Sequence, residues 1–543
     1  MESGAMKYSL VLLFLLPTII LAAKFYDDDP LLRTPPPLAA PDVEERELSD
    51  FYDLFLNAFT YAAEKQGETI DELIPAQAVN TLGEVPDSEW FTNRIGTEGF
   101  TRTELLRGPG DANPPADGPW TIISAKTQGI TPGFLIEDTT GQRYLLKFDP
   151  MTNPEMNSGA DMLGPKLFYA LGYNTPENYL VTVDPDGFEI GDGATVLSIA
   201  GKERRMNRTD IGDVIDRVPR QPDGSIRGLA SRFLHGQPLG PFQYHGTRSD
   251  DPNDVVLHEH RRDLRGLYVF ASWLGHDDSR AINSLDMLVE EDDKKFVKHH
   301  LLDFGSILGS ASNMANSPRS GNQYLFSWRH TWRQIFSLGA FVPQWYRWNY
   351  QKFPAIGLFE WEIYRPDQWT PEYRNPTFEN RLPDDTYWAA KKVMAFRDDD
   401  LRAIVGLAKY SDPAAAEWLI TCLIKRRDKV GDFYFRRVLP VDNFGVDGDA
   451  LTFEHLGAKY GLFEAPEITF EWSQFDNASE QHTPIEGEAS PRLPAAVRDG
   501  TDGFYSAKLT GDDQQKTVTV YLRKESSDYY IVGIDRTWPL PRN

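Results

Sequence analysis

The feature that most constrains the fold is a change of pattern near residue 120. Three short runs rich in branched and aromatic residues follow one another there, separated by turn-forming segments, over residues 120–126, 133–137 and 143–148. Such runs predict three antiparallel strands. A helix over residues 157–171 and a strand over 178–183 are expected next. This order predicts an α+β domain, although many α+β domains share it.

The chain is too long for one hydrophobic core, because cores stop growing near about 250–300 residues and this sequence has 543. Residues 196–430 are mostly helical and aromatic in pattern, with helices expected over 263–274, 328–336, 386–396, 399–408 and 413–428. Strand-like runs return over 468–472, 517–522 and 529–534, so residues 431–543 are expected to form a β-rich module.

The N-terminal part has three sections. Residues 1–23 have the layout of a signal peptide or N-terminal anchor, with Lys7 before an uncharged apolar run that ends in small residues. We therefore expect an exported protein, periplasmic, secreted or membrane-anchored, with a membrane tether through residues 7–23 as one form. Residues 24–43 are expected to be a stiff Pro-rich linker. Residues 44–119 are expected to be a helical extension that begins with an amphipathic helix over 44–67.

Charge and cysteine content exclude several classes of function. The formal net charge is −25, and the Lys and Arg residues are scattered rather than gathered into a stripe, so nucleic acid is not expected as a partner. The chain has one cysteine, Cys422, and therefore no intrachain disulfide.

Two short motifs carry the chemistry. In the first, the sequence Gly-His-Asp-Asp-Ser-Arg-Ala-Ile-Asn places Asp278 and Asn283 five residues apart. In the second, an apolar run ends in Asp303-Phe304-Gly305, twenty residues after Asn283. Phosphoryl transfer depends mainly on positioning and on charge neutralisation around metal-bound phosphates, which asks for acidic and amide groups on opposite sides of a reacting centre.

These motifs resemble the catalytic loop and the Asp-Phe-Gly metal loop of the protein-kinase superfamily. The resemblance implies that Asp278 is the catalytic base and that Asn283 and Asp303 hold the metal. It also implies that Lys147, at the end of the third expected strand, contacts the nucleotide phosphates and is a catalytic residue.

The resemblance extends to the loop and the helix on either side of Lys147. The loop between the first two strands offers Lys126, Gly129 and Gly133 to the nucleotide, although it lacks the family's three-glycine pattern. Asp161, on the inner face of the following helix, takes the place of the family's lysine-pairing acid, with Glu155 as the alternative.

Two departures separate the chain from ordinary eukaryotic protein kinases. Asp277 stands where the family has an arginine, and a Trp-rich run follows Asp303 in place of an Ala-Pro-Glu motif. The sequence is more similar to atypical members such as HipA-like kinases and secretory-pathway or spore-coat kinases.

The sequence thus predicts a two-lobed protein-kinase-like fold, with a small lobe over 120–195 and a large lobe over 196–430, between the helical extension and the β module. The expected activity is transfer of phosphate from ATP, or another nucleoside triphosphate, with Mg²⁺ or Mn²⁺, to an unknown hydroxyl acceptor on a protein or small molecule. The alternative is a catalytically silent kinase-fold scaffold of the cell envelope.

Overall fold

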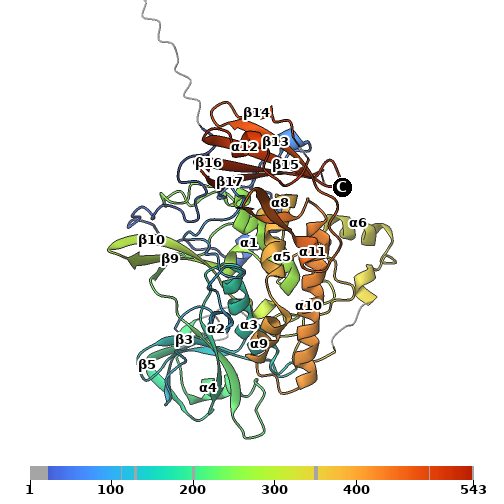
Figure 1. Cartoon of the computed structure of the whole chain (residues 1–543). Helices are drawn as coiled ribbons and strands as arrows, with labels where there is room; N and C mark the ends of the chain where they lie inside the picture. The colour runs from blue at the N-terminus through green and yellow to red at the C-terminus, as the bar shows by residue number, and fades with distance from the viewer. Residues whose placement is uncertain are drawn as a thin grey trace, which may run out of the picture.

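The computed structural model describes residues 23–111, 113–126, 131–197, 202–347, 352–487 and 489–540. A sheet-rich small lobe lies at one end of the molecule, a helical large lobe lies in the middle, and a β module lies at the other end (Figure 1). This arrangement confirms the predicted α+β class and the two-lobed, protein-kinase-like plan. Each of the three parts has a buried hydrophobic cluster of its own.

The small lobe is built on a seven-stranded sheet in the order β4-β7-β3-β2-β1-β5-β6. Its strands are β1 Trp120–Ala125, β2 Gly133–Glu137, β3 Arg143–Phe148, β4 Asn178–Val183, β5 Phe188–Leu197, β6 Glu203–Arg205 and β7 Ile226–Arg232. The strands β1, β2 and β3 pair antiparallel, as predicted. Helix α4 (Arg208–Ile215) packs on the sheet through Ile211 and Ile215, which join a core containing Phe134 and Leu146.

The small lobe is larger than the sequence suggested. The sheet continues past residue 195, because β5 runs to Leu197 and both β6 and β7 join the same sheet. Strand β6 is a three-residue, fully charged and exposed strand, so it lacks the apolar alternation by which a strand is recognised in sequence. Residues up to Arg232 therefore belong to the small lobe rather than to the helical lobe.

Helix α3 (Met156–Leu171) connects the small lobe to the rest of the molecule. Nearly all of its residues are buried, and two of its glycines allow close packing of neighbouring groups. A Cβ added at Gly164 would lie 2.4 Å from Cβ of Phe304, and one added at Gly159 would lie 2.4 Å from the hydroxyl of Tyr410. The helix thus lies directly against the segment that carries Asp303.

The large lobe is a bundle around α5 (Arg262–Leu274), every residue of which is buried. The other helices of this lobe are α6 Trp328–Phe336, α7 Pro376–Glu379, α8 Pro383–Met394, α9 Asp398–Gly406 and α10 Pro413–Phe435. Trp273 on α5 and Trp388 on α8 are among the largest fully buried side chains. The five helices expected in this region are all present, and α10 continues beyond its predicted end at residue 428.

A small sheet of β8 (Gln237–Pro238), β9 (Ser284–Glu291) and β10 (Lys294–Leu301) belongs to the same lobe. The one-turn helices η2 His258–His260, η3 Ala281–Asn283, η4 Phe304–Ser306 and η5 Gln344–Arg347 lie among these elements. The antiparallel hairpin β9–β10 starts directly after η3 and ends just before η4. It therefore holds the two sequence motifs next to each other.

The C-terminal module is β-rich, as predicted. Its main sheet is antiparallel in the order β14-β13-β15-β16-β17. Its elements are β11 Val441–Asp447, β12 Ala450–His455, α11 Leu456–Lys459, β13 Thr469–Asp476, β14 Gln481–Pro484, α12 Ala495–Arg498, β15 Gly503–Thr510, β16 Thr517–Glu525 and β17 Asp528–Thr537.

The N-terminal extension departs from its prediction. Its first helix, α1, spans only Asp50–Phe59, and the other described residues of 44–119 are irregular apart from η1 (Ile70–Glu72) and α2 (Arg102–Arg107). This irregular chain is nevertheless packed, since Trp90 and Phe91 enter the core of the large lobe. Tertiary packing holds these residues in place, and no local hydrophobic periodicity in the sequence predicts it.

Residues 24–43 are not a free spacer. Phe25 is 3% exposed in a cluster with Phe475, Tyr521 and Val532 of the β module, and Ala40 and Val43 are buried against Leu239, Leu288 and Val297. The proline content made this segment look like a solvated linker, but its apolar residues are anchored on the body. The predicted signal or anchor over residues 1–23 lies almost wholly outside the described residues. Among the described helices, none has the length and apolarity needed to cross a membrane.

We expect Phe25→Ala to lower the melting temperature of the β module, because the change removes a buried ring that contacts Phe475, Phe504 and Tyr521 at centroid distances of 6.0, 6.1 and 4.9 Å. Truncation of a buried Phe typically costs about 3–5 kcal/mol. Scanning calorimetry measures the loss. The control is Leu32→Ala, whose side chain is 70% exposed, and it should leave the transition in place. An unchanged transition in Phe25→Ala would mean that residues 24–43 do not hold the module.

Candidate nucleotide and metal site

Lys147 is the centre of the candidate site. Strand β3 carries it into the interior, where its side chain is 9% exposed. Its Nζ donates hydrogen bonds to Oδ2 of Asp161 at 2.9 Å and to Oδ1 of Asp303 at 2.9 Å. An ammonium group has three donors, so one remains for a phosphate oxygen. The geometry thus brings together the lysine, the helix acid and the metal-loop acid.

The two acids differ in their surroundings. The Asp161 side chain is 1% exposed, whereas that of Asp303 is 49% exposed. The Lys147 charge holds the pKa of Asp303 below its ordinary value, so this carboxylate is anionic and open to solvent at neutral pH. Burial lowers the pKa of Lys147, but the charges of Asp161 and Asp303 outweigh burial and raise it above its ordinary value. The lysine is therefore a permanent cation.

The alternative acid, Glu155, lies elsewhere. It is the residue that precedes α3, and its carboxylate accepts a hydrogen bond from the backbone N–H of Ser411 at 2.9 Å. The side-chain amide of Asn178 donates a hydrogen bond to the backbone carbonyl of Asp161 at 2.7 Å. The side chain of Asp161 is one methylene shorter than that of a glutamate, but it still reaches Lys147 because α3 packs close to β3.

The metal loop has an unusual backbone. Asp303 has φ 52° and ψ 70°, a left-handed conformation that aspartate tolerates better than most residues. Gly305 has no room for a side chain, since an added Cβ would lie 2.6 Å from both Oδ1 of Asn157 and Oγ of Ser312. Asn157 is buried, and both polar atoms of its side chain lack a hydrogen-bond partner within the described residues. Packing thus requires the glycine of the Asp-Phe-Gly sequence.

A chain of short contacts joins the two motifs. The side-chain amide of Asn283 donates to the backbone carbonyl of Asp278 at 2.8 Å, and the backbone carbonyl of Asn283 accepts from Leu302 at 2.9 Å. The amide nitrogen of Asn283 is thereby used, and its Oδ1 is the atom suited to a cation. These bonds join Asn283 to Asp278 and to Leu302, the residue directly before Asp303.

The catalytic loop contains an ion pair that the sequence did not reveal. Nε of Arg280 donates to Oδ1 of Asp278 at 2.6 Å, and Nη1 of Arg280 lies 3.3 Å from Oδ2 of Asp53 on helix α1. Asp53 is fully buried, and Tyr373 stacks on the same guanidinium at 4.6 Å. Arg280 was visible in the quoted motif, two residues after Asp278. Its partner Asp53 was not, because a single acid on an amphipathic helix has no signature.

The glycine loop is only partly described. Gly129 lies outside the described residues. Gly133 is within β2 opposite Lys147, where an added Cβ would lie 2.1 Å from the carbonyl oxygen of Leu146, so strand packing explains this glycine. Nζ of Lys126 donates to Oγ1 of Thr131 at 2.7 Å. Burial and the nearby Lys147 charge lower the pKa of Lys126 to about 8.

His276 packs between helix α3 and the segment that carries Asp303. It is buried, its ring packs edge-on against Phe168 at 5.7 Å, and Phe304 lies 6.0 Å away. Burial lowers the pKa of His276, so the ring is neutral at pH 7. The imidazole therefore has a packing role between α3 and the metal loop.

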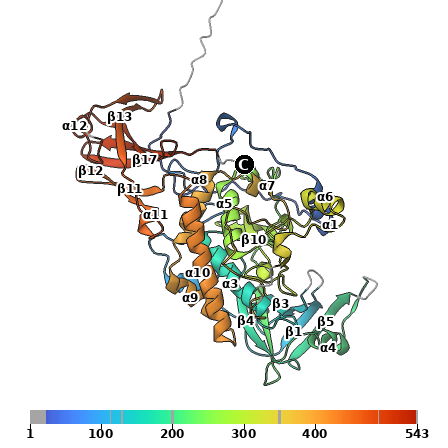
Figure 2. The same ribbon diagram turned by 90° about the vertical axis from the view of Figure 1, so that its right-hand side faces the viewer.

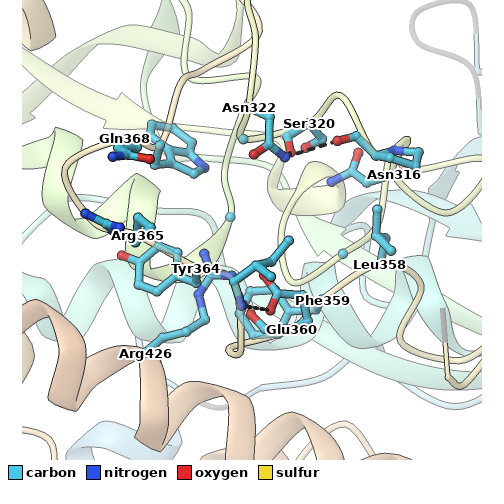
Figure 3. Close-up of a pocket in the computed structure, with 16 residues that line it drawn as sticks. Asn316, Ser320, Asn322, Leu358, Phe359, Glu360, Tyr364, Arg365, Gln368 and Arg426 are labelled. Atoms are coloured by element: carbon cyan, nitrogen blue, oxygen red, sulfur yellow. Dashed lines mark hydrogen bonds between the residues drawn. The ribbon is translucent and has the colours of Figure 1, made fainter. Parts of the chain in front are cut away.

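A pocket in the large lobe opens beside the catalytic loop (Figure 3). Ser320 in its lining donates a hydrogen bond to Asp277, the residue that replaces the family's arginine. Arg426, also in the lining, donates to the backbone carbonyls of Trp273, Glu360 and Ser272 at 2.8, 2.9 and 2.6 Å and stacks on Tyr364 at 3.7 Å. Its charge is thus used within the protein, and the pocket is separate from the site around Lys147.

The residues around Asp303 suit a hard divalent cation. The donors are a solvent-exposed carboxylate and an amide oxygen, and Mg²⁺ and Mn²⁺ prefer oxygen ligands. Mg²⁺ is commonly held by one or two protein groups, with water and substrate phosphates completing its shell. Among the described residues no group of three or more His, Cys, Asp or Glu side chains could hold an ion without such help. Asn283 and Asp303 would hold the metal together with the nucleotide.

The fold is two-lobed and protein-kinase-like. No protein-family model matches the chain, and no curated protein matches its sequence. Solved structures similar to it include a Golgi casein kinase with Mn/ADP bound, at 9% identity over 61% of this chain and 73% of that chain, with a TM-score of 0.28. A second Golgi casein kinase structure matches at 11% identity over 74% and 96%, with a TM-score of 0.29. The Helicobacter pylori proinflammatory kinase CtkA matches at 13% over 58% and 97%, also with a TM-score of 0.29. These scores are low, so the assignment depends on the chain's own geometry.

Asp161 and Asp303 share Lys147 but differ in burial. We expect Asp161→Asn to lower the free energy of unfolding by about 3 kcal/mol, because it removes one partner of a buried ion pair. We expect Asp303→Asn to cost about 1 kcal/mol or less, because its half-exposed carboxylate is screened by water. Urea unfolding of both variants measures the difference. Equal losses would contradict the assignment of Asp161 as the structural partner.

Proposed function

We propose that the protein transfers the terminal phosphate of a nucleoside triphosphate, in the presence of Mg²⁺ or Mn²⁺, to a hydroxyl group. The observation that carries the proposal is the Lys147 ammonium held at 2.9 Å from both Asp161 and Asp303. A structural ion pair would need one buried acid; a second, exposed and anionic acid beside the same lysine suits a site for metal-bound phosphates.

The chain's own groups have distinct tasks in this reaction. Asp161 fixes the position of the Lys147 ammonium, whose remaining proton donates to a phosphate oxygen. Lys126 adds a second positive charge near the Lys147 ammonium. The charges of Lys147, Asp161 and Asp303 all act on the pKa of Lys126. The metal, when bound at Asn283 and Asp303, would neutralise charge on the phosphates.

Asp278 is on the acceptor side of the site. Its carboxylate accepts the proton of the attacking hydroxyl while the bond from phosphorus to the acceptor oxygen forms and the bond to the nucleotide breaks. Arg280 orients this carboxylate at 2.6 Å.

The test is incubation of the purified protein with γ-labelled ATP and Mn²⁺ or Mg²⁺, beside Asp303→Ala and Asp278→Ala. Each substitution should reduce label transfer by at least about a hundredfold, because each removes a group that acts on the reacting phosphate or the acceptor. Asp186→Ala, at an exposed turn of the small lobe, is the control and should transfer label normally. Transfer that survives both site substitutions would overturn the proposal.

The pH dependence of nucleotide binding provides an independent test of Lys126. A lysine with a pKa of about 8 is charged below that pH and loses its charge above it. We expect nucleotide affinity to fall about tenfold as pH rises from about 7 to about 9, since a charged hydrogen bond is lost. In Lys126→Arg the affinity should stay level, because the pKa of arginine lies above about 12. Calorimetric titration across this range measures both, and equal slopes would exclude Lys126 from the phosphate site.

One observation favours a second candidate, the silent scaffold. Asp278 is paired with Arg280, which also reaches the buried Asp53, so the proposed base is engaged before any acceptor arrives. Thermal stabilisation by a nucleotide discriminates between the candidates, because a ligand that binds the native state raises its melting temperature. A scaffold without a nucleotide site would show no shift with any nucleoside triphosphate and metal.

We propose further that the protein acts outside the cytoplasm. The support is the sequence of residues 1–23, with its basic start and apolar run. N-terminal sequencing of the mature protein from fractionated cells tests export and cleavage together.

A further inference from the structure

Helix α6 lies on the surface of the large lobe, and its apolar side is exposed to solvent. Helix α6 has no buried residue among its nine. Trp328, Trp332 and Phe336 follow one another at four-residue spacing on one side, with exposed fractions of 56%, 49% and 81%. The rings of Trp328 and Trp332 stack at 6.1 Å and those of Trp332 and Phe336 at 5.8 Å. Exposed patches of large apolar side chains mark interaction sites in soluble proteins.

Helix α1 extends this face. The two helices lie at the same height of the molecule in Figure 2, and Phe59 of α1 meets Phe326, just before α6, at 5.0 Å. Phe55 packs on Phe59 at 5.3 Å and is 51% exposed, and Phe51 is 77% exposed. Successive ring contacts join α1 to α6, and we call the rings in this run the aromatic ridge: Phe55, Phe59, Phe326, Trp328, Trp332 and Phe336.

The charge on the α6 part of the aromatic ridge is opposite to that of the molecule. The chain has 81 acidic residues, yet the sequence between Asp303 and Glu360 contains no Asp or Glu. Of the basic residues in this stretch, Arg319 and Lys352 form ion pairs with Glu372 and Glu362 at 3.0 and 3.7 Å. Arg329 and Arg333 are exposed on α6 itself, next to the aromatic side. Helix α6 is therefore a positively charged, aromatic segment on the surface of a protein whose formal net charge is −25.

We propose that the aromatic ridge binds the surface of a membrane containing anionic phospholipids. Trp, Phe and Arg are the residues that favour the boundary between headgroups and acyl chains, and an amphipathic helix with a basic polar side lies flat in that boundary. Arg329 and Arg333 make the α6 part of the ridge complementary to an anionic surface, which would repel the rest of this acidic chain. In Figure 1, α6 stands at the outer edge of the large lobe, where a flat bilayer can reach it.

The test uses the full-length protein and vesicles of phosphatidylcholine, with and without phosphatidylglycerol, that carry bromine-labelled acyl chains. Bromine quenches tryptophan fluorescence only at short range, so quenching reports insertion of particular side chains even if residues 7–23 also tether the protein. We expect quenching with anionic vesicles, and we expect Trp328→Phe/Trp332→Phe to remove at least about half of it. The matched control, Trp361→Phe/Trp418→Phe, changes two tryptophans packed against the core and should retain the quenching.

A charge reversal separates lipid binding from other contacts. Arg329→Glu/Arg333→Glu should weaken binding to the anionic vesicles at least about tenfold, because each basic residue near such a surface contributes measurably to binding. Lys294→Glu/Lys295→Glu makes the same change in net charge at the exposed β9–β10 turn and should bind like the wild type. Unchanged quenching in the tryptophan variant, or equal binding of both charge variants, would overturn the proposal. So would sedimentation showing that the ridge is covered by a second copy of the chain.

Discussion

The ammonium group of Lys147 lies where three parts of the molecule meet. It belongs to β3, and its two partners belong to α3 and to the loop after β10. A buried charge is strongly unfavourable unless it is paired, so strand, helix and loop must be in place together. The close approach of Gly164 to Phe304 and the lack of space at Gly305 hold α3 and the Asp-Phe-Gly segment in register. The charge cluster around Lys147 therefore connects the small lobe to the large lobe, as does Arg227, which donates to the backbone carbonyls of Ala408 and Lys409.

The other side of the site depends on the N-terminal extension. Arg280 connects the catalytic loop to the buried Asp53 of α1, and Tyr373 covers the guanidinium. Helix α1 therefore has two faces with different tasks. One carries an acid into the protein beneath the catalytic loop, and the other presents aromatic rings to solvent beside α6. An extension that lies outside the kinase-like body in sequence is part of that body in space.

The sequence was informative where chemistry or periodicity is local. The strands around Lys147 and the helix carrying Asp161 were predictable, because alternating apolar residues and a helix-ending glycine act over a few positions. Asp278, Asn283 and Asp303 were singled out from the spacing of two motifs, and the β9–β10 hairpin joins these two segments. The packing of residues 24–43 was not predictable, since Phe25 finds its neighbours far away in the β module and prolines resemble a linker. Asp53 was missed for the same reason: its meaning comes from Arg280, distant in sequence.

The anchoring of Phe25 also determines when the molecule can be completed. Lys24 forms an ion pair with Asp535 at 2.6 Å, and the backbone N–H of Phe25 donates to the side chain of Asn477 at 2.8 Å. These partners lie 511 and 452 residues further along the chain. The two lobes can form during synthesis, but the segment after residue 23 has no docking place until the sheet of the β module exists, and contacts so distant in sequence form slowly. The newly made chain therefore passes through a stage in which an apolar segment stays uncovered until the β module has formed.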